Sequence, residues 1–198
     1  YKTEQKNKQL EKEKLQHELA FLKAQINPHF LFNTINSIYV LININPHKAA
    51  DTLLKFASML RYQLYDCTGT SIELERELNL ISDLIELEKM RKGEHIEVCC
   101  SLPDTPSGFR IAPFLLVPVV ENAFKHVSDM REGADFIRIK ATLEQDIFQL
   151  EVVNSCSPGM DGMLRSGGIG LKNMRRRLDL LYPDKHKIEV QQTSGIFK

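Results

Sequence analysis

The decisive stretch of this chain is Gln25-Ile26-Asn27-Pro28-His29-Phe30-Leu31-Phe32-Asn33, in which a histidine directly follows a proline that bends or loosens a helix. On both sides of the proline, apolar residues recur at alternating steps of four and three, as they do in a coiled-coil seam. The seam changes register at the proline, from Leu15, Leu19, Leu22 and Ile26 to Leu31, Ile35, Ile38 and Ile42.

The histidine of this stretch, His29, lies a little over half a helical turn from Leu31. It therefore faces away from the second apolar stripe and toward solvent. This placement favours a nucleophile presented to a reaction partner. A surface histidine beside an ordinary kink is the alternative, because isolated histidines on helices are commonly structural.

A second informative segment runs from Pro113 to His126 and is typical of a buried helix whose apolar run ends in polar residues. Asn122, Lys125 and His126 share one face of this helix by the three-and-four rule. An amide oxygen can ligand Mg²⁺, and lysine and histidine side chains can contact phosphate oxygens. This face therefore carries the groups needed to hold a metal-bound triphosphate.

A third segment places Gly167, Gly168 and Gly170 just before an amphipathic helix that is expected to run from about Gly170 to Tyr182. Glycines allow close approach of the backbone to a ligand, and the amides at a helix start favour an anion. A flexible turn that caps the helix is the alternative interpretation.

The first part of the chain predicts a helical hairpin. One long helix is expected from Thr3 to about Asn43, and Asn45-Pro46 marks the start of a second, with asparagine as the cap and proline at the first helical position. The second helix is expected to end near Asp66. Two such hairpins, from two chains, make a four-helix bundle.

The remainder alternates between helices and strands. The segment Thr70-Ser71-Ile72-Glu73 matches a capping box that would open a helix through Arg91. Further helices are expected over residues 113–126 and 170–182, and strands over 96–102, 136–143, 147–153 and 187–192, with a tight turn at Gln145-Asp146. Consecutive strands with helices on one face predict an α+β two-layer sandwich. We therefore expect two domains, residues 1–69 and residues 70–198.

The composition limits the kinds of partner and environment that the chain can have. Lys+Arg and Asp+Glu are both 26, so the formal net charge is zero, which argues against a nucleic-acid partner. The four cysteines show no paired spacing, so reduced thiols are expected. The longest apolar run, Phe114 to Val120, is too short to cross a bilayer.

Together and in this order, the three segments resemble the LytS-type sensor histidine kinases, from about Leu19 to Tyr182, and the segment around His29 is the most specific of them. Arg61-Tyr62 also resembles a recurrent element of that family. The resemblance implies a dimeric four-helix bundle that carries the phosphoacceptor, followed by a GHKL, or Bergerat-type, α/β two-layer sandwich that binds ATP.

The resemblance also implies a role for each motif residue. His29 is expected to be the phosphoacceptor, and Asn33, one turn later on the same face, is close enough to orient its imidazole. Glu121 is a secondary catalytic candidate that would act as a base. The remaining residues would bind Mg-ATP: Asn122 as the Mg²⁺ ligand, Lys125 and His126 at the phosphates, and Gly168, Gly170 and Leu171 in the phosphate loop.

One position departs from the family pattern. After the strand expected over residues 147–153, the family has an acidic residue that recognises the adenine amino group, whereas this chain has Asn154. The oxygen of Asn154 can accept from that amino group, and its NH₂ can donate to the neighbouring ring nitrogen. Asp161 is a weaker substitute. Because Asn154 is uncharged, we expect Asn154→Asp to tighten nucleotide binding about tenfold.

The implied function is a sensor histidine kinase of a two-component system that autophosphorylates His29 with ATP and passes the phosphoryl group to an aspartate of a response-regulator receiver domain. The alternative is a degenerate relative that acts as a dimeric signalling module with weak or no nucleotide binding, which only Asn154 supports. A GHKL ATPase coupled to conformational change would leave the segment around His29 unexplained.

The ends of the chain indicate a fragment. It begins with Tyr1 rather than Met, and residues 195–198 read like the opening of a strand, so we expect truncation at the C-terminus. The resemblance implies a membrane-anchored sensor upstream. The chain would then be the cytoplasmic portion of a bacterial inner-membrane protein.

Overall fold

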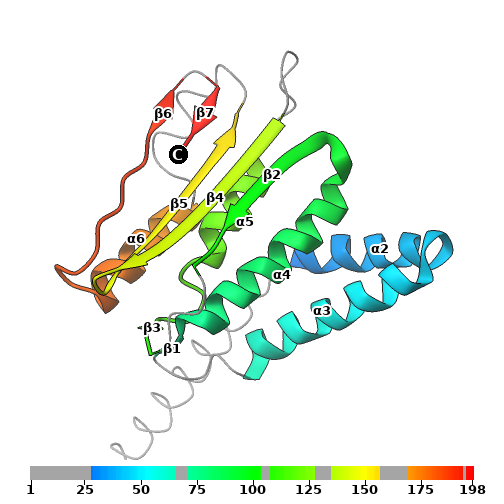
Figure 1. Cartoon of the computed structure of the whole chain (residues 1–198), viewed down its shortest axis with the longest axis horizontal. Helices are drawn as coiled ribbons and strands as arrows, with labels where there is room; N and C mark the ends of the chain where they lie inside the picture. The colour runs from blue at the N-terminus through cyan, green and yellow to red at the C-terminus, as the bar shows by residue number, and fades with distance from the viewer. Residues whose placement is uncertain (1–27, 66–70, 104–107, 128–134, 157–168, 194) are drawn as a thin grey trace, which may run out of the picture. The chain divides into compact units, whose positions relative to one another are not determined.

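The computed structural model describes residues 28–65, 71–103, 108–127, 135–156, 169–193 and 195–198. The chain divides into two compact units, residues 1–66 and residues 67–198, which are described separately below (Figure 1). The helix expected over residues 3–27 lies outside the described part of the chain. The functional division into residues 1–69 and 70–198 stays a prediction.

The described part of the first unit is a helical hairpin made of α2 (Pro28–Ile44) and α3 (Pro46–Tyr65). Only Asn45 separates the two helices. Its backbone N–H donates to the carbonyl of Leu41 at 2.7 Å, and its side-chain Oδ1 accepts from the backbone N–H of Lys48 at 3.0 Å. The predicted cap and the proline at the first helical position are therefore confirmed.

The hairpin buries one face of each helix against the other. The rings of Phe30 and Phe56 pack against each other in a tilted arrangement, with centroids 6.5 Å apart. The other buried residues of this face are Thr34, Ile38, Ala49, Thr52, Met59 and Tyr62. The predicted stripe is therefore only partly right, because Ile38 is buried whereas Ile35 and Ile42 are more than half exposed. Those two side chains lie on another face of α2 and are not used by the hairpin.

The second unit contains a mixed five-stranded sheet in the order β2-β4-β5-β7-β6. Its strands are β2 (Ile96–Ser101), β4 (Asp135–Glu144), β5 (Ile147–Ser155), β6 (Gln192–Thr193) and β7 (Ile196–Phe197). The β2–β4 pair is parallel and the other pairs are antiparallel. Gln145 and Asp146, both with positive φ, form the predicted tight turn between β4 and β5.

Three helices belong to this unit: α4 (Leu74–Lys92), α5 (Val117–His126) and α6 (Ile169–Leu181). α5 and α6 lie behind the sheet in Figure 1, and a short 3₁₀ helix, η2 (Gly93–His95), joins α4 to β2. The core between these layers is apolar and includes Leu74, Ile81, Leu84, Val120, Phe124, Ile137 and Ile139. The unit is therefore of the predicted mixed α+β class. Among the described helices, none is long and apolar enough to cross a membrane.

The predicted capping box at residues 70–73 is wrong. Ile72 and Glu73 form a short strand, β1, that pairs with β3 (Arg110–Ile111), and α4 begins at Leu74 with no side-chain cap. The Ser71 hydroxyl accepts a hydrogen bond from Nε of Arg110 at 3.1 Å instead of capping the helix. A long-range pairing has thus replaced the local signal.

Two other predicted boundaries differ. α5 begins at Val117 rather than Pro113, because Phe114 has a φ of 54°, in the left-handed region, which interrupts a helix. Residues 187–191 are not a strand. Gln191 exchanges two backbone hydrogen bonds with Lys198, and the pairing continues in β6, which forms a hairpin with β7. Gly195, with a φ of 83°, supplies the turn between these two strands.

Candidate functional site

The second unit contains a cavity of about 520 Å³ between the sheet and two helices. One wall is formed by Val119 and Asn122 of α5 with Leu115 just before the helix, and another is the face of α6 that carries Leu171, Met174 and Leu178. Both sets follow helical spacing, so each helix presents a single stripe to the cavity. β5 and residues 186–190 complete the lining. A volume of this size suits a nucleotide-sized ligand.

The cavity brings together residues from two of the three sequence motifs. Asn122 of α5 and Asn154 of β5 both line it, as does Leu171 at the start of α6. These residues are distant in sequence and meet only because α5 packs on β5 and α6 packs beside α5. The lining is mainly apolar, with a few polar groups, as in most small-molecule sites.

The side chain of Asn154 has one unusual property. Only 1% of the residue is exposed, and its Nδ2 donates to the backbone carbonyl of Ser155 at 2.9 Å. Among the described residues, its Oδ1 is the one buried side-chain polar atom that lacks a hydrogen-bond partner. A buried acceptor without a partner is costly, so a donor from a bound ligand would stabilise it. An adenine amino group is such a donor.

This geometry corrects two expectations about Asn154. One of the two N–H groups of its NH₂ is engaged by Ser155, so only the other is left to donate to the ring of a base. An aspartate here would place a carboxylate oxygen against the carbonyl oxygen of Ser155 and would repel it. The expected gain from Asn154→Asp is therefore reversed. The bond to Ser155 fixes the amide so that it presents an acceptor, which is the property that an aspartate would supply.

The network around this strand end is otherwise satisfied. The hydroxyl of Ser155 accepts from the backbone N–H of Phe136 at 3.1 Å and donates to Asp135 Oδ1 at 3.3 Å. These bonds tie the ends of β4 and β5 together directly behind Asn154. The position of Asn154 in the cavity wall is therefore held by the sheet itself.

The other predicted residues of α5 lie outside the cavity lining. Lys125 is exposed and His126 is half-buried, both in the last turn of the helix. Partial burial, and then the charge of Lys125, lower the pKa of His126 below its ordinary value. At neutral pH His126 is therefore mainly an uncharged imidazole, which can still donate a hydrogen bond to a phosphate oxygen.

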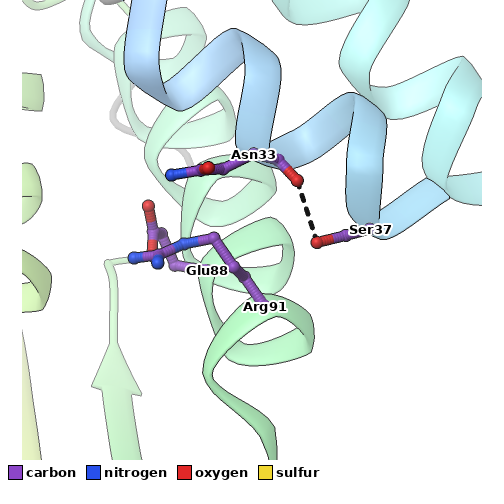
Figure 2. Close-up of polar contacts among 4 residues, drawn as sticks. All are labelled: Asn33, Ser37, Glu88 and Arg91. Atoms are coloured by element: carbon purple, nitrogen blue, oxygen red, sulfur yellow. Dashed lines mark hydrogen bonds and ion pairs between the residues drawn. The ribbon is translucent and has the colours of Figure 1, made fainter. Parts of the chain in front are cut away.

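Glu121, also on α5, is influenced by an acidic residue of α4. Burial, and then the negative charge of Glu88 on α4, raise its pKa from 4.5 to about 7. Glu88 is itself buried and accepts from Nε of Arg91 at 3.0 Å (Figure 2). A carboxyl group with a pKa near 7 is suited to general acid–base work.

Residues of the other two motifs are only partly described. His29 is the second residue of α2, and its side chain lies outside the described part of the structure, as does Gly168. Asn33 lies one turn after His29, and its backbone carbonyl accepts from the Ser37 hydroxyl at 3.0 Å (Figure 2). Gly170 is the second residue of α6.

Sequence reasoning missed the polar residues that support the cavity wall. Glu77 of α4 is completely buried and binds the backbone ahead of α5, as do Arg177 and Tyr182 from the end of α6. The sequence did contain a pattern that could have identified the acidic residues. Glu77 and Glu88 occupy positions of the apolar stripe of α4, whose other members are Leu74, Leu78, Ile81, Leu84 and Ile85. Charged residues on such a stripe are buried only when they have partners.

Comparison with known proteins first gives the class. Residues 17–96 match the family model described as "Histidine kinase". The fold agrees, because the histidine kinase domain of the blue-light activated histidine kinase EL346 of Erythrobacter litoralis superposes with a TM-score of 0.50. That comparison covers 93% of this chain and 90% of the other, at 15% identity, so it bears on the fold alone.

The chain is also similar to sensor proteins named LytS, which agrees with the resemblance that the motifs predicted. It is 31% identical to Sensor protein LytS of Staphylococcus saprophyticus over 184 residues, which are 87% of this chain and 31% of that protein. It is 29% identical to Sensor histidine kinase/phosphatase LytS of Staphylococcus aureus strain MRSA252 over 190 residues, or 90% of this chain and 32% of that protein. The chain thus spans about a third of the length of these curated relatives.

Proposed function

We propose that this chain is the kinase core of a two-component sensor, in which His29 takes the γ-phosphoryl group of Mg-ATP and passes it to an aspartate of a response-regulator receiver domain. The observation that carries the proposal is the unpartnered, buried Oδ1 of Asn154 in a cavity that Asn122 also lines. The similarity to LytS sensors supports it independently.

The cavity would take the adenine ring. Asn154 presents an acceptor because its NH₂ is held by Ser155, and the adenine amino group is a matching donor. Guanine carries a carbonyl oxygen at the same ring position, which would face another acceptor. We therefore expect selection for ATP over GTP, since mismatched buried polar groups are discriminated strongly.

The phosphates would lie toward the end of α5. Asn122 would be a Mg²⁺ ligand through its side-chain oxygen, and Lys125 and His126 would contact the phosphates together with the glycine-rich loop that includes Gly168 and Gly170. The metal ion, when bound, neutralises charge on the phosphate oxygens.

The chemistry is an in-line displacement at the γ-phosphorus. A nitrogen lone pair of the His29 imidazole forms the N–P bond, and the bond from phosphorus to the β–γ bridging oxygen breaks, so that ADP leaves with the electron pair. Asn33 would orient the imidazole. A neutral imidazole already has a lone pair, so it needs less activation by a base than a hydroxyl does, and Glu121 would have at most a secondary role.

The active form would be a homodimer with a four-helix bundle. Within one hairpin, large apolar side chains on α2 remain exposed at helical spacing, namely Phe32, Ile35, Tyr39 and Ile42. Leu53 and Leu54 of α3 are exposed as well. A second copy of the hairpin would bury these faces, as in bundles of antiparallel helices. In the full-length protein a membrane-anchored sensor would precede this part.

The test is incubation of the purified chain with γ-labelled ATP and Mg²⁺. We expect label that is labile to acid and stable to base, as phosphohistidine is. His29→Gln should abolish the label while retaining ATP binding and dimerisation, and the matched control His47→Gln, an exposed histidine on α3, should be labelled like the parent. Label in His29→Gln, or label mapped to His126, would refute the assignment of the phosphoacceptor.

A second candidate function is a dimeric signalling module that does not bind nucleotide, and the uncharged Asn154 favours it. Titration with Mg-ATP separates the two functions, since the module would show no saturable binding. Binding with release of phosphate but no phosphohistidine would indicate an ATPase instead.

A further inference from the structure

The segment that leads into α5, residues 112–116, is buried but has no regular secondary structure. Several of its backbone polar groups bond to side chains from other elements. The N–H groups of Phe114 and Leu116 donate to the two carboxylate oxygens of Glu77, at 3.0 Å and 3.1 Å. The N–H of Ala112 donates to the hydroxyl of Tyr182 at 2.7 Å.

Arg177 of α6 completes the set from the opposite side. Its Nη1 donates to the carbonyl of Phe114 at 3.1 Å, and its Nη2 donates to the carbonyl of Pro113. Phe114, the residue in the left-handed conformation, is thus bound through its N–H by α4 and through its carbonyl by α6. A bulky residue keeps such a conformation only where its surroundings enforce it.

These contacts join the helices that wall the cavity. Arg177 and Tyr182 come from the second half of α6 and the residue after its last turn, whereas Leu171 and Met174 from its first half line the cavity. The segment that they bind is followed directly by α5, which carries Asn122. Fixing one end of α6 against the start of α5 therefore fixes the separation of the two walls.

We propose that Arg177 and Tyr182 are positioning residues, which act through residues 112–116 to hold α6 over the nucleotide cavity at the distance that ATP requires. The proposal rests on the proposed function for the identity of the ligand. Neither residue lines the cavity as Leu171 does; Arg177 and Tyr182 act through the placement of Leu171 and Met174.

The first measurement is the dissociation constant for Mg-ATP, obtained by calorimetric titration at a temperature well below the melting temperature of each variant. Arg177→Met removes both carbonyl contacts and should weaken binding at least about tenfold, the scale of losing hydrogen bonds from a charged group. Arg177→Lys keeps the charge but lacks the planar guanidinium that spans two carbonyls. Its affinity for Mg-ATP should lie between those of the parent and of Arg177→Met. Arg176→Met, at the exposed neighbour on the same helix, is the control and should bind like the parent.

The second measurement needs no nucleotide. Amide hydrogen exchange of residues 169–181 in the ligand-free chain should become faster in Arg177→Met, while β4 and β5 keep parental protection and Arg176→Met stays unchanged. Tyr182→Phe removes a single hydroxyl and is the milder variant if Arg177→Met does not fold. It should weaken Mg-ATP binding about threefold or more, because it leaves the buried N–H of Ala112 without its acceptor.

A lower melting temperature with parental Mg-ATP affinity in Arg177→Met or Tyr182→Phe would overturn the proposal, because it would make the contacts merely structural. Equal exchange of α6 in Arg177→Met and Arg176→Met would overturn it as well. Absence of Mg-ATP binding in the parent would count against the proposed function instead. The exchange of α6 would then decide on the positioning role alone, with faster exchange confined to Arg177→Met supporting it.

Discussion

The hairpin and the α+β unit differ in which groups their described residues leave without a partner. The hairpin leaves large apolar side chains in solvent, with Phe32 and Tyr39 each 68% exposed. The α+β unit instead buries charged side chains such as Glu77 and Glu88 and gives them partners. Among the described residues, the hairpin leaves apolar side chains of α2 uncovered, and the α+β unit leaves the buried Oδ1 of Asn154 without a donor. The proposed second copy would cover the first group, and the proposed nucleotide would supply the donor for the second.

The strongest test of this contrast is to make the exposed face of α2 charged. Replacing Phe32, Ile35 and Tyr39 together by Asp should convert the dimer to monomers, because burying each of these side chains contributes roughly 1–3 kcal/mol and charge forbids burial. Light scattering at concentrations of about tens of micromolar measures the change.

Lys48→Asp, at an exposed position of α3 that does not share the face of Leu53 and Leu54, is the matched control and should remain dimeric. A monomeric parent at the same concentration would remove the basis of the contrast. The buried Ile38 is left unchanged, since an aspartate there would unfold the hairpin itself.

Asn122→Ala tests the nucleotide proposed for the second unit. We expect Mg-dependent ATP binding to weaken about a hundredfold, at the upper end of losses seen for groups around a metal, with the fold intact because Asn122 is only half-buried. Asn173→Ala, at an exposed asparagine of α6, should have little effect. If Asn122→Ala binds Mg-ATP as tightly as the parent, Asn122 is not a ligand.

Asn154→Asp tests whether Asn154 binds the adenine base, and so sharpens the comparison between the two units. We expect about tenfold weaker binding of ATP at neutral pH, because the new carboxylate opposes the carbonyl of Ser155 in a buried site. Calorimetry with ATP and with GTP measures both affinity and selectivity. Tighter ATP binding would show that charge at this position matters more than the fixed orientation of the amide.

Glu121→Gln should have the smallest effect, on stability and its pH dependence. The folded pKa of Glu121 is raised to about 7 from an ordinary 4.5, so the folded state retains a proton that the unfolded state loses. Its contribution to stability is therefore fully present below about pH 4.5 and falls as pH rises to about 7. The glutamine variant lacks this decline and should be more stable by about 1 kcal/mol at pH 7.5.

Urea unfolding of the parent and of Glu121→Gln at pH 5.5 and 7.5 checks this linkage, with the two pH values chosen to lie on either side of about 6.5. Glu144→Gln, at an exposed glutamate of β4, is the control. Identical pH dependence in parent and Glu121→Gln would mean that Glu121 titrates normally.

The sequence predicted the features that depend on local chemistry. Asn45 and Pro46 mark a helix start, Gln145-Asp146 marks a two-residue turn, and the long helices follow from apolar spacing. The misses depend on distant partners. β1 forms because Ile72 pairs with Ile111, and no local pattern reports that pairing. The late start of α5 depends on Glu77 and on the backbone of Phe114.

The candidate site divides in the same way. The motifs identified Asn122 and Asn154, and the structure brings both to one cavity. The motifs could not reveal that one N–H of the Asn154 amide is engaged, because its partner is a backbone carbonyl. Nor could they identify Arg177, since one arginine in a run of three looks like a solvated helix face until its contacts are known.

The connection between α2 and α3 has a mechanical consequence. A single residue, Asn45, links them, and its N–H, carbonyl and side chain are all engaged in hydrogen bonds. Such a connection has little conformational freedom. A rotation applied to α2 would therefore be transmitted to α3 instead of being absorbed by the turn. Three inserted glycines at Asn45 would act as a swivel, and a signal that arrives as rotation would then stop at the end of α2.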